Sequence, residues 1–304
     1  MIDLSVSLGE KFKLSNPVLT ASGTFGYGDE IADLLDINCF GGIVTKSLSL
    51  KPREGNPPPR IVETASGMIN SIGLANIGLD RFIAEKAEFL QSLSCKVIVN
   101  IAGLEENEYG EVLRRLTDFA WIDGFEINVS CPNVKEGGIE FGVDRTVLGR
   151  LVRKLRDLTD KFLIVKLSPN VTDIRPLAET VQAQRGDAVS MINTLYGCAI
   201  DIYTRRPLIN SVIGGLSGPA IKPVALAHII KTSKVIDIPI IGIGGIRNGA
   251  DVVEFLLAGA AAVQLGTVNF FNPTALNGIL EFLQDYCRQQ KIKALRELVG
   301  KVQL

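Results

Sequence analysis

IPIIGIGGIRNGADVVEFLLAGAAAVQLGT, the stretch from residue 238 to residue 267, holds two short apolar runs on either side of a stretch with helical spacing. The runs at 238–241 and 261–265 are mostly apolar, as strands buried on both faces are. Between them, Asn248 has the character of a helix start, and apolar residues recur at helical spacing over 250–257. The stretch therefore predicts a strand–helix–strand unit inside a core.

The same unit recurs along the chain. Eight short apolar runs read as strands, at 18–20, 42–45, 97–99, 125–129, 163–165, 188–192, 238–241 and 261–265. Helical spacing separates several of them, at 79–93, 107–119, 144–158 and 250–257. Eight such repeats predict an α/β fold, the (β/α)8 TIM barrel, with residues 1–304 as a single domain. An open doubly wound sheet is the alternative, but no G-x-G-x-x-G fingerprint follows the first run.

Three segments do not fit the bare repeat. Residues 6–14 predict a hairpin that closes the bottom of the barrel. Residues 47–78 and 195–219 are long, and the first is rich in Pro and Gly. Loops of this length in a compact domain are usually lids or binding loops, so we expect both at the functional site.

Composition excludes several classes of protein. Of 304 residues, 46% are hydrophobic and 21% are charged, enough for a sizeable core. The net charge of −1 argues against nucleic acid as the main partner. The five cysteines are widely spaced without a C-x-x-C pair, so a disulfide framework or a metal site held by this chain is not expected. We see no signal peptide and no apolar run of ~18 residues, so the cytoplasm is the predicted location.

Polar or glycine residues close every predicted strand. In chain order they are Ser22, Lys46, Asn100, Asn128, Lys166, Asn193, the pair Gly244-Gly245 and the pair Gly266-Thr267. A single polar strand end is more often structural. A barrel, however, gathers the carboxyl ends of its strands at one face, so these ends together predict one shared site.

The seventh and eighth strand ends are glycine turns, and both precede further turns or helices. In barrels these two loops often bind a phosphate through backbone N–H groups. Tight strand-to-helix turns are the structural reading, but the barrel context favours phosphate. Lys46 and Lys166 end apolar strands, where a cation needs a negative partner. A salt bridge, a Schiff-base lysine and a cation beside an anionic cofactor ring are the three readings, and the phosphate turns favour the third.

Cys131 follows the fourth strand, in a loop broken by Pro132 and flanked by Asn128 and Asn133. A thiol in such a loop is a candidate base or nucleophile. The other four cysteines are read as inert packing residues. His228 is the only histidine and lies in a predicted helix, which disfavours Ser-His-Asp and Cys-His mechanisms.

Four asparagines fall on the strand-end loops, namely Asn70, Asn128, Asn133 and Asn193. Side-chain amides both donate and accept hydrogen bonds, which suits a substrate with amide and imide groups. Asparagine is also a routine turn residue, so this observation only suggests a substrate class.

Taken together, these segments resemble the dihydroorotate dehydrogenases of pyrimidine synthesis, over residues 16–267. The matching segments are 21–28, 45–47, 70–74, 128–138, 165–170, 192–194, 215–219 and the two glycine turns. The loop cysteine resembles the soluble class 1 enzymes, and residues 134–138 resemble the 1B branch, in which NAD⁺ is the final acceptor. Glu136 and Ile77 stand where histidine and proline are expected.

The resemblance implies a set of site residues. For FMN they are Ser22, Lys46, Ser47, Asn100, Asn128, Lys166, Ile192, Gly218, Gly244, Gly245, Gly266 and Thr267. For the pyrimidine they are Lys46, Asn70, Ser71, Ile72, Gly73, Leu74, Asn128, Asn133, Asn193 and Thr194. Cys131 would be the catalytic residue, and no metal is implied.

The resemblance also implies the reaction and the assembly. (S)-Dihydroorotate would be oxidised to orotate on the route to UMP, with Cys131 as base and Lys166 stabilising the reduced ring. One FMN per chain is expected, in a homodimer within a heterotetramer whose second subunit carries FAD and a 2Fe–2S cluster. Fumarate as acceptor stays open.

Three rival functions stay open at this stage. The first is a lyase or aldolase that uses Lys46 or Lys166 as a Schiff base. The second is a flavin-dependent RNA modifier, although neither a basic surface nor an extra domain is visible. The third is a module that binds a phosphorylated ligand without chemistry.

Overall fold

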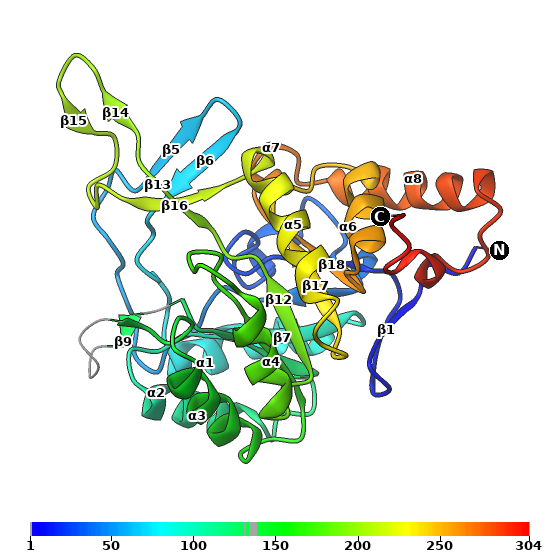
Figure 1. Cartoon of the computed structure of the whole chain (residues 1–304). Coiled ribbons are helices and arrows are strands. Elements are labelled where there is room, and N and C mark those ends of the chain that lie inside the picture. Colours follow the sequence, from blue (N-terminus) through cyan, green and yellow to red (C-terminus); the bar gives the residue numbers. More distant parts are fainter. Residues whose placement is uncertain (1, 131, 134–138, 304) are drawn as a thin grey trace.

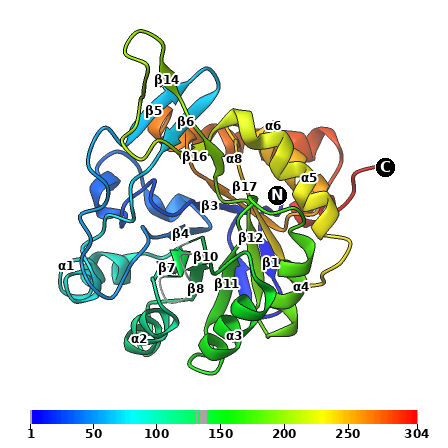
Figure 2. The same cartoon turned by 60° about the vertical axis from the view of Figure 1, so that its left-hand side comes forward.

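The structure is a computed structural model that describes residues 2–130, 132–133 and 139–303, with the backbone alone at 132, 133, 139 and 140. Eight parallel strands close into a barrel in the order β11-β12-β17-β18-β3-β4-β7-β8 (Figures 1 and 2). They are β3 (Val18–Thr20), β4 (Gly42–Val44), β7 (Lys96–Ile101), β8 (Gly124–Asn128), β11 (Phe162–Lys166), β12 (Ala188–Met191), β17 (Ile240–Ile243) and β18 (Ala262–Leu265). The predicted (β/α)8 barrel is confirmed.

The barrel strands lie at the eight apolar runs. The seventh begins at Ile240 rather than at residue 238. Pro239 has no N–H to donate, and only its carbonyl joins the ladder, by accepting from the Val189 N–H at 3.1 Å.

Helices follow most barrel strands and lie outside the barrel (Figure 1). They are α1 (Leu79–Ser92), α2 (Glu106–Leu116), α3 (Arg145–Arg156), α4 (Arg175–Ala183), α5 (Lys222–Thr232), α6 (Gly249–Ala258), α7 (Val268–Phe271) and α8 (Ala275–Gln289). Short 3-10 turns are η1 (Asp29–Ile31), η2 (Ile37–Cys39), η4 (Pro219–Ile221) and η5 (Leu295–Leu298). The predicted start of α6 is confirmed, because Asn248 and Asp251 form a capping box. Asp144 caps α3 through the N–H groups of Thr146 and Val147.

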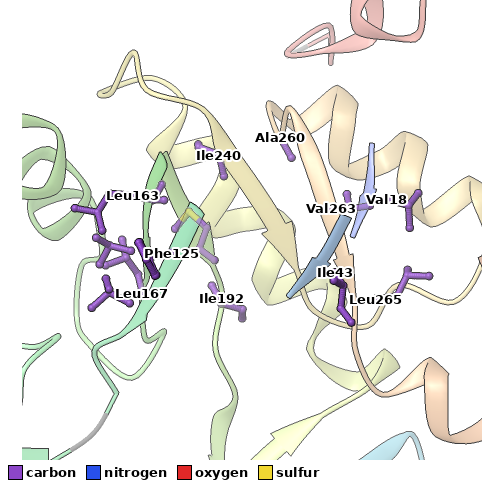
Figure 3. Packing of buried hydrophobic residues seen from close by; sticks show 14 of the residues in the cluster. Val18, Ile43, Phe125, Leu163, Leu167, Ile192, Ile240, Ala260, Val263 and Leu265 are labelled. Carbon is purple, nitrogen blue, oxygen red and sulfur yellow. The ribbon is translucent and has the colours of Figure 1, made fainter. Parts of the chain in front are cut away.

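Along each strand, successive side chains point alternately outward and inward, into two different cores. Outward side chains such as Val18, Phe125 and Val263 pack with the helices in the larger core (Figure 3). Inward side chains at the amino ends of the strands, such as Phe162, pack with the hairpin β1 (Val6–Leu8) and β2 (Phe12–Leu14). The predicted hairpin therefore closes the bottom of the barrel, where its apolar residues are removed from water.

A second sheet lies above the opposite end, where the two long loops were predicted. It contains β5 (Ile61–Thr64), β6 (Gly67–Asn70), β13 (Leu195–Gly197) and β16 (Gly214–Ser217), in the order β13-β16-β6-β5. Two small hairpins complete the strands, β9 (Pro132–Asn133) with β10 (Ile139–Glu140) and β14 (Ile200–Asp201) with β15 (Arg206–Pro207). Figures 1 and 2 both show β5, β6, β14 and β16 grouped together and standing away from the barrel.

Candidate active site

A cavity of about 1040 Å³ opens between the carboxyl ends of the barrel strands and the second sheet. Its lining includes most residues implied for FMN, namely Ser22, Lys46, Ser47, Asn128, Lys166, Ile192, Gly218, Gly244, Gly245, Gly266 and Thr267. It also includes most residues implied for the pyrimidine, namely Asn70, Ser71, Ile72, Gly73, Leu74, Asn193 and Thr194. The structure thus brings both predicted sets into one cavity at the active-site end of the barrel.

Three glycine-containing turns meet on one side of this cavity. A Cβ added to Gly218 would lie 2.7 Å from the Cα of Gly67, and one added to Gly245 would lie 2.8 Å from the Gly218 carbonyl oxygen. Gly218 and Gly245 also have φ values of 96° and 74°, which favour glycine. The Thr267 hydroxyl hydrogen-bonds the Ser217 hydroxyl at 2.8 Å and joins the eighth strand end to this group. The wall that results exposes backbone, as a phosphate-binding turn requires.

Lys46 follows β4 and reaches the cavity from a half-buried position. Its backbone N–H donates to the Gly26 carbonyl oxygen at 2.8 Å, which fixes the chain at this point. Desolvation by burial lowers the pKa of its ammonium group, the charge of Glu30 opposes this shift, and the charge of Arg60 adds to it. Within the described residues its ammonium makes no ion pair, so the salt-bridge reading finds no support at Lys46. An anionic ligand would supply the missing partner.

Lys166 ends β11 on the floor of the cavity, and its side chain is 7% exposed. Its Nζ donates to the Ser22 Oγ at 3.3 Å and lies 3.9 Å from the Glu126 Oε1. For this lysine the salt-bridge reading is therefore confirmed, with a partner inside the barrel.

The sequence did not predict a role for Glu126, because residues 125–129 form a mostly apolar run that predicts a buried strand. The signal was present, since a carboxylate in the middle of a buried strand requires several polar partners. The predicted FMN residue Asn100 is one of them. It is fully buried below the cavity and donates from Nδ2 to the Glu126 Oε1 at 2.6 Å.

Cys131 lies outside the described residues, and Asn133 is described by its backbone alone. The chain that leads to them is held firmly on the cavity wall. The Asn193 Nδ2 donates to the Ser130 Oγ at 2.9 Å, and the Tyr109 hydroxyl donates to the Asn128 carbonyl oxygen at 2.7 Å. Asn128 and Ser130 both line the cavity, so the candidate base follows a fixed segment of its wall.

The segment 70–74 forms the opposite wall. The Asn70 Nδ2 donates to the Gly215 carbonyl oxygen at 3.4 Å, and the Asn56 Nδ2 donates to the Ser71 Oγ at 2.7 Å. The first bond ties the two long insertions together, and the second holds the first insertion in shape. The side of the segment that faces the cavity carries amide and hydroxyl groups, which can bind a polar ring.

Three arginines that the sequence analysis did not single out, Arg53, Arg60 and Arg247, also line the cavity. Arg60 is held in place because its Nη1 donates to the Asn56 carbonyl oxygen at 3.1 Å. With the two lysines they outnumber Glu63, the one acidic residue in the described lining. The cavity is therefore suited to anionic ligands.

Residues read as packing lie elsewhere, but the packing reading is wrong for Cys39 and Cys198, which are exposed, and holds for the buried Cys95 and Cys287. His228 lies in α5, and burial lowers the pKa of its imidazole. Burial raises the pKa of Cys95 to about 11, as expected for an inert thiol. Among the described residues there is no group of three or more His, Cys, Asp or Glu that could hold a metal ion. None of the helices described is long and apolar enough to cross a membrane.

Comparison with known proteins agrees with this arrangement. Residues 4–286 match the family profile described as Dihydroorotate dehydrogenase. The chain is 51% identical to the protein of Citrifermentans bemidjiense named dihydroorotate dehydrogenase B (NAD⁺), catalytic subunit, over 99% of both chains. The protein of the same name from Geotalea daltonii is also 51% identical, again over 99% of both chains.

Solved structures match the whole fold, and we describe one of them. It is the dihydroorotate dehydrogenase of Eimeria tenella in complex with ferulenol, with a TM-score of 0.80 and 24% identity, over 98% of this chain and 88% of that one. At 24% identity this likeness shows the fold alone, whereas the two sequence matches at 51% identity show the family. The chain belongs to the dihydroorotate dehydrogenase family.

Proposed function

We propose that this chain oxidises (S)-dihydroorotate to orotate, a step in the de novo synthesis of UMP, as one FMN-binding domain over residues 1–304. One observation carries the proposal. The cavity at the barrel mouth combines two lysines, a wall of glycine turns and a set of side-chain amides. The relatives named as dihydroorotate dehydrogenase B match the chain along its whole length, which supports the same reaction.

The residues present fit FMN at the barrel mouth. The turns of Gly218 and Gly245 would receive the phosphate, since they line the cavity and pack against other backbone too closely to carry side chains. Lys46 has an ammonium without an ion pair within the described residues, whereas Asn100 lies below the cavity and donates its amide to Glu126. FMN, when bound, would supply redox chemistry by accepting a hydride from C6 of the substrate.

The chain's own residues would do the remaining work. Lys46 would sit between cofactor and substrate, and Lys166 would stabilise negative charge on the reduced cofactor. Asn70, Asn193 and Thr194 would bind the ring through their amide and hydroxyl groups. Cys131 would accept the proton from C5 as the C5–C6 double bond forms, so that proton and hydride leave the substrate separately.

We also propose a cytoplasmic assembly in which two copies of this chain work with a second subunit. That subunit would carry FAD and a 2Fe–2S cluster and would pass electrons to NAD⁺. The name "catalytic subunit" of the matched relatives supports a partner of this kind. Co-purification tests it: NAD⁺ reduction should require the second chain, and full NAD⁺ reduction by this chain alone would refute the assignment.

The function itself is tested with the purified chain and a dye as electron acceptor. The protein should bind FMN and reduce the dye only when dihydroorotate is added. A protein that refuses FMN, or that takes it up and leaves dihydroorotate unchanged, would overturn the proposal. Trapping of a carbonyl substrate by borohydride on Lys46 or Lys166 would favour the Schiff-base rival instead.

A further inference from the structure

Glu126 lies in the middle of β8 and is 0% exposed. Its neighbours Phe125 and Ile127 belong to the outer core, so alternation along the strand turns the carboxylate into the barrel. There it accepts three hydrogen bonds, from the Asn100 Nδ2 at 2.6 Å, the Ser190 Oγ at 2.8 Å and the Gln264 Nε2 at 2.6 Å. Donors from three other strands thus converge on one buried carboxylate.

Both side-chain amides point their NH₂ groups at the carboxylate. The Asn100 Oδ1 and the Gln264 Oε1 are buried and have no donor, because each amide turns its NH₂ toward Glu126. The hydrogen bonds that converge on the carboxylate must therefore offset the cost of two unsatisfied acceptors.

A buried negative charge requires a nearby positive charge, and the ammonium of Lys166 supplies it. Its Nζ lies 3.9 Å from the Glu126 Oε1, and within the described residues Glu126 has no other ion pair. The same ammonium faces the cavity, where the other charged residues of the described lining are Lys46, Arg53, Arg60, Glu63 and Arg247. The residues around the pair on β7, β12 and β18 are the neutral Asn100, Ser190 and Gln264.

We propose that Glu126 is a positioning residue for Lys166, whose charge it holds in place on the cavity floor. Without the carboxylate, the five cations of the described cavity lining would have only Glu63 in that lining to balance them. The ammonium of Lys166 would then lose its proton more readily, because burial disfavours an unpaired charge. The part of this inference that concerns the cofactor rests on the proposed function.

A double-mutant cycle on the FMN-free protein tests the pairing alone. Glu126→Gln keeps the shape and removes the charge, and the Asn100 and Gln264 amides can turn to accept from the new NH₂ group. Glu126→Gln should lower Tm by roughly 6–10 °C in the parent and by much less in a Lys166→Met background. Equal losses in both backgrounds would overturn the pairing. If Glu126→Gln does not fold, folding of the double variant supports the pairing, and its failure refutes it.

The reduction potential of bound FMN, measured from pH 6 to pH 9, tests the positioning. A nearby cation favours the reduced and more negative flavin. The potential of Glu126→Gln, relative to the parent, should therefore fall progressively as pH rises and Lys166 loses its proton. Ser190→Ala is the matched control, since it removes one hydrogen bond to Glu126 but no charge, and its curve should run parallel to the parent.

A Glu126→Gln curve that also runs parallel to the parent would limit Glu126 to a structural role. This result is distinguishable from failure of the proposed function, in which no FMN binds and the potential cannot be measured. The Tm cycle remains readable in that case, because it uses the protein without FMN.

Discussion

At the scale of single residues, Cys131 has the most direct role in the proposed reaction. Cys131→Ala should still bind FMN, and so stay yellow, because the residues proposed for the cofactor are untouched. It should lose roughly 10²–10⁴-fold in turnover at neutral pH, the usual contribution of a general base. Turnover with dihydroorotate and the flavin absorbance, measured on one preparation, check both parts.

Cys131→Ser is the conservative partner of that variant. A serine hydroxyl gives up its proton far less readily than a thiol, whose pKa is ordinarily about 8.5. Activity should therefore appear only at higher pH. Full activity of Cys131→Ala at neutral pH would remove Cys131 from the role of base.

Replacing Lys46 should weaken ligand binding without lowering the stability of the fold. Because burial lowers the pKa of Lys46, the ammonium form is disfavoured in the folded protein. This cost is fully present below the folded-state pKa and disappears as pH rises through it toward the unfolded value. At pH 7, Lys46→Met should therefore leave Tm unchanged or raise it, while the Kd for orotate rises roughly 10- to 100-fold.

Thermal unfolding without ligand and calorimetric titration with orotate check the two halves. Ser92→Ala, on the exposed end of α1, is a suitable control because Ser92 lies outside the cavity lining. Loss of stability in Lys46→Met without loss of orotate affinity would contradict the assignment.

At the scale of elements, Gly218 packs against Gly67 at the end of the second sheet and against Gly245 after β17, so it joins that sheet to the barrel mouth. A Cβ at Gly218 would lie 2.7 Å from a backbone atom, and its φ of 96° is strained for any L side chain. Gly218→Ala should therefore lower the unfolding free energy by about 2 kcal/mol or more and weaken FMN binding. Chemical denaturation and FMN fluorescence titration measure the two effects.

The matched control is Gly278→Ala. Gly278 lies in α8 with nothing within 4 Å of its added Cβ, so the same substitution meets no obstacle there. Alanine is the better helix former by about 1 kcal/mol, so this variant should be as stable as the parent or more so. Destabilisation by both variants alike would show that the Gly218 contact is not the cause.

Elements also show what the sequence could predict. The barrel strands and α6 were predictable, because buried parallel strands and capped helices leave local patterns. The second sheet was not, since β6 and β16 pair Asn70 with Gly215, far apart in the chain. Glu126 was missed for a related reason. Its partners come from three other strands, and no local pattern reports them.

At the scale of the whole molecule, the barrel separates its functional end from its stabilising end. The cavity lies at the carboxyl ends of the strands, whereas the hairpin β1–β2 fills the amino ends. Substitutions in the core at the bottom of the barrel should therefore change stability without changing ligand binding.

Phe12 tests this separation. It is 4% exposed, and its ring stacks on Phe162 with centroids 4.4 Å apart. Phe12→Ala should cost about 3–5 kcal/mol of unfolding free energy, because the closed bottom cannot collapse around the lost ring. The Kd values for FMN and orotate, measured well below the lowered Tm, should stay within about twofold of the parent. Phe12 lies at the opposite end of the barrel from the cavity, so its loss should destabilise the free and the ligand-bound folded protein equally. If ligand affinity fell together with stability, the two ends would be coupled through the barrel interior, and the network around Glu126, which lies between them, would be the first place to look.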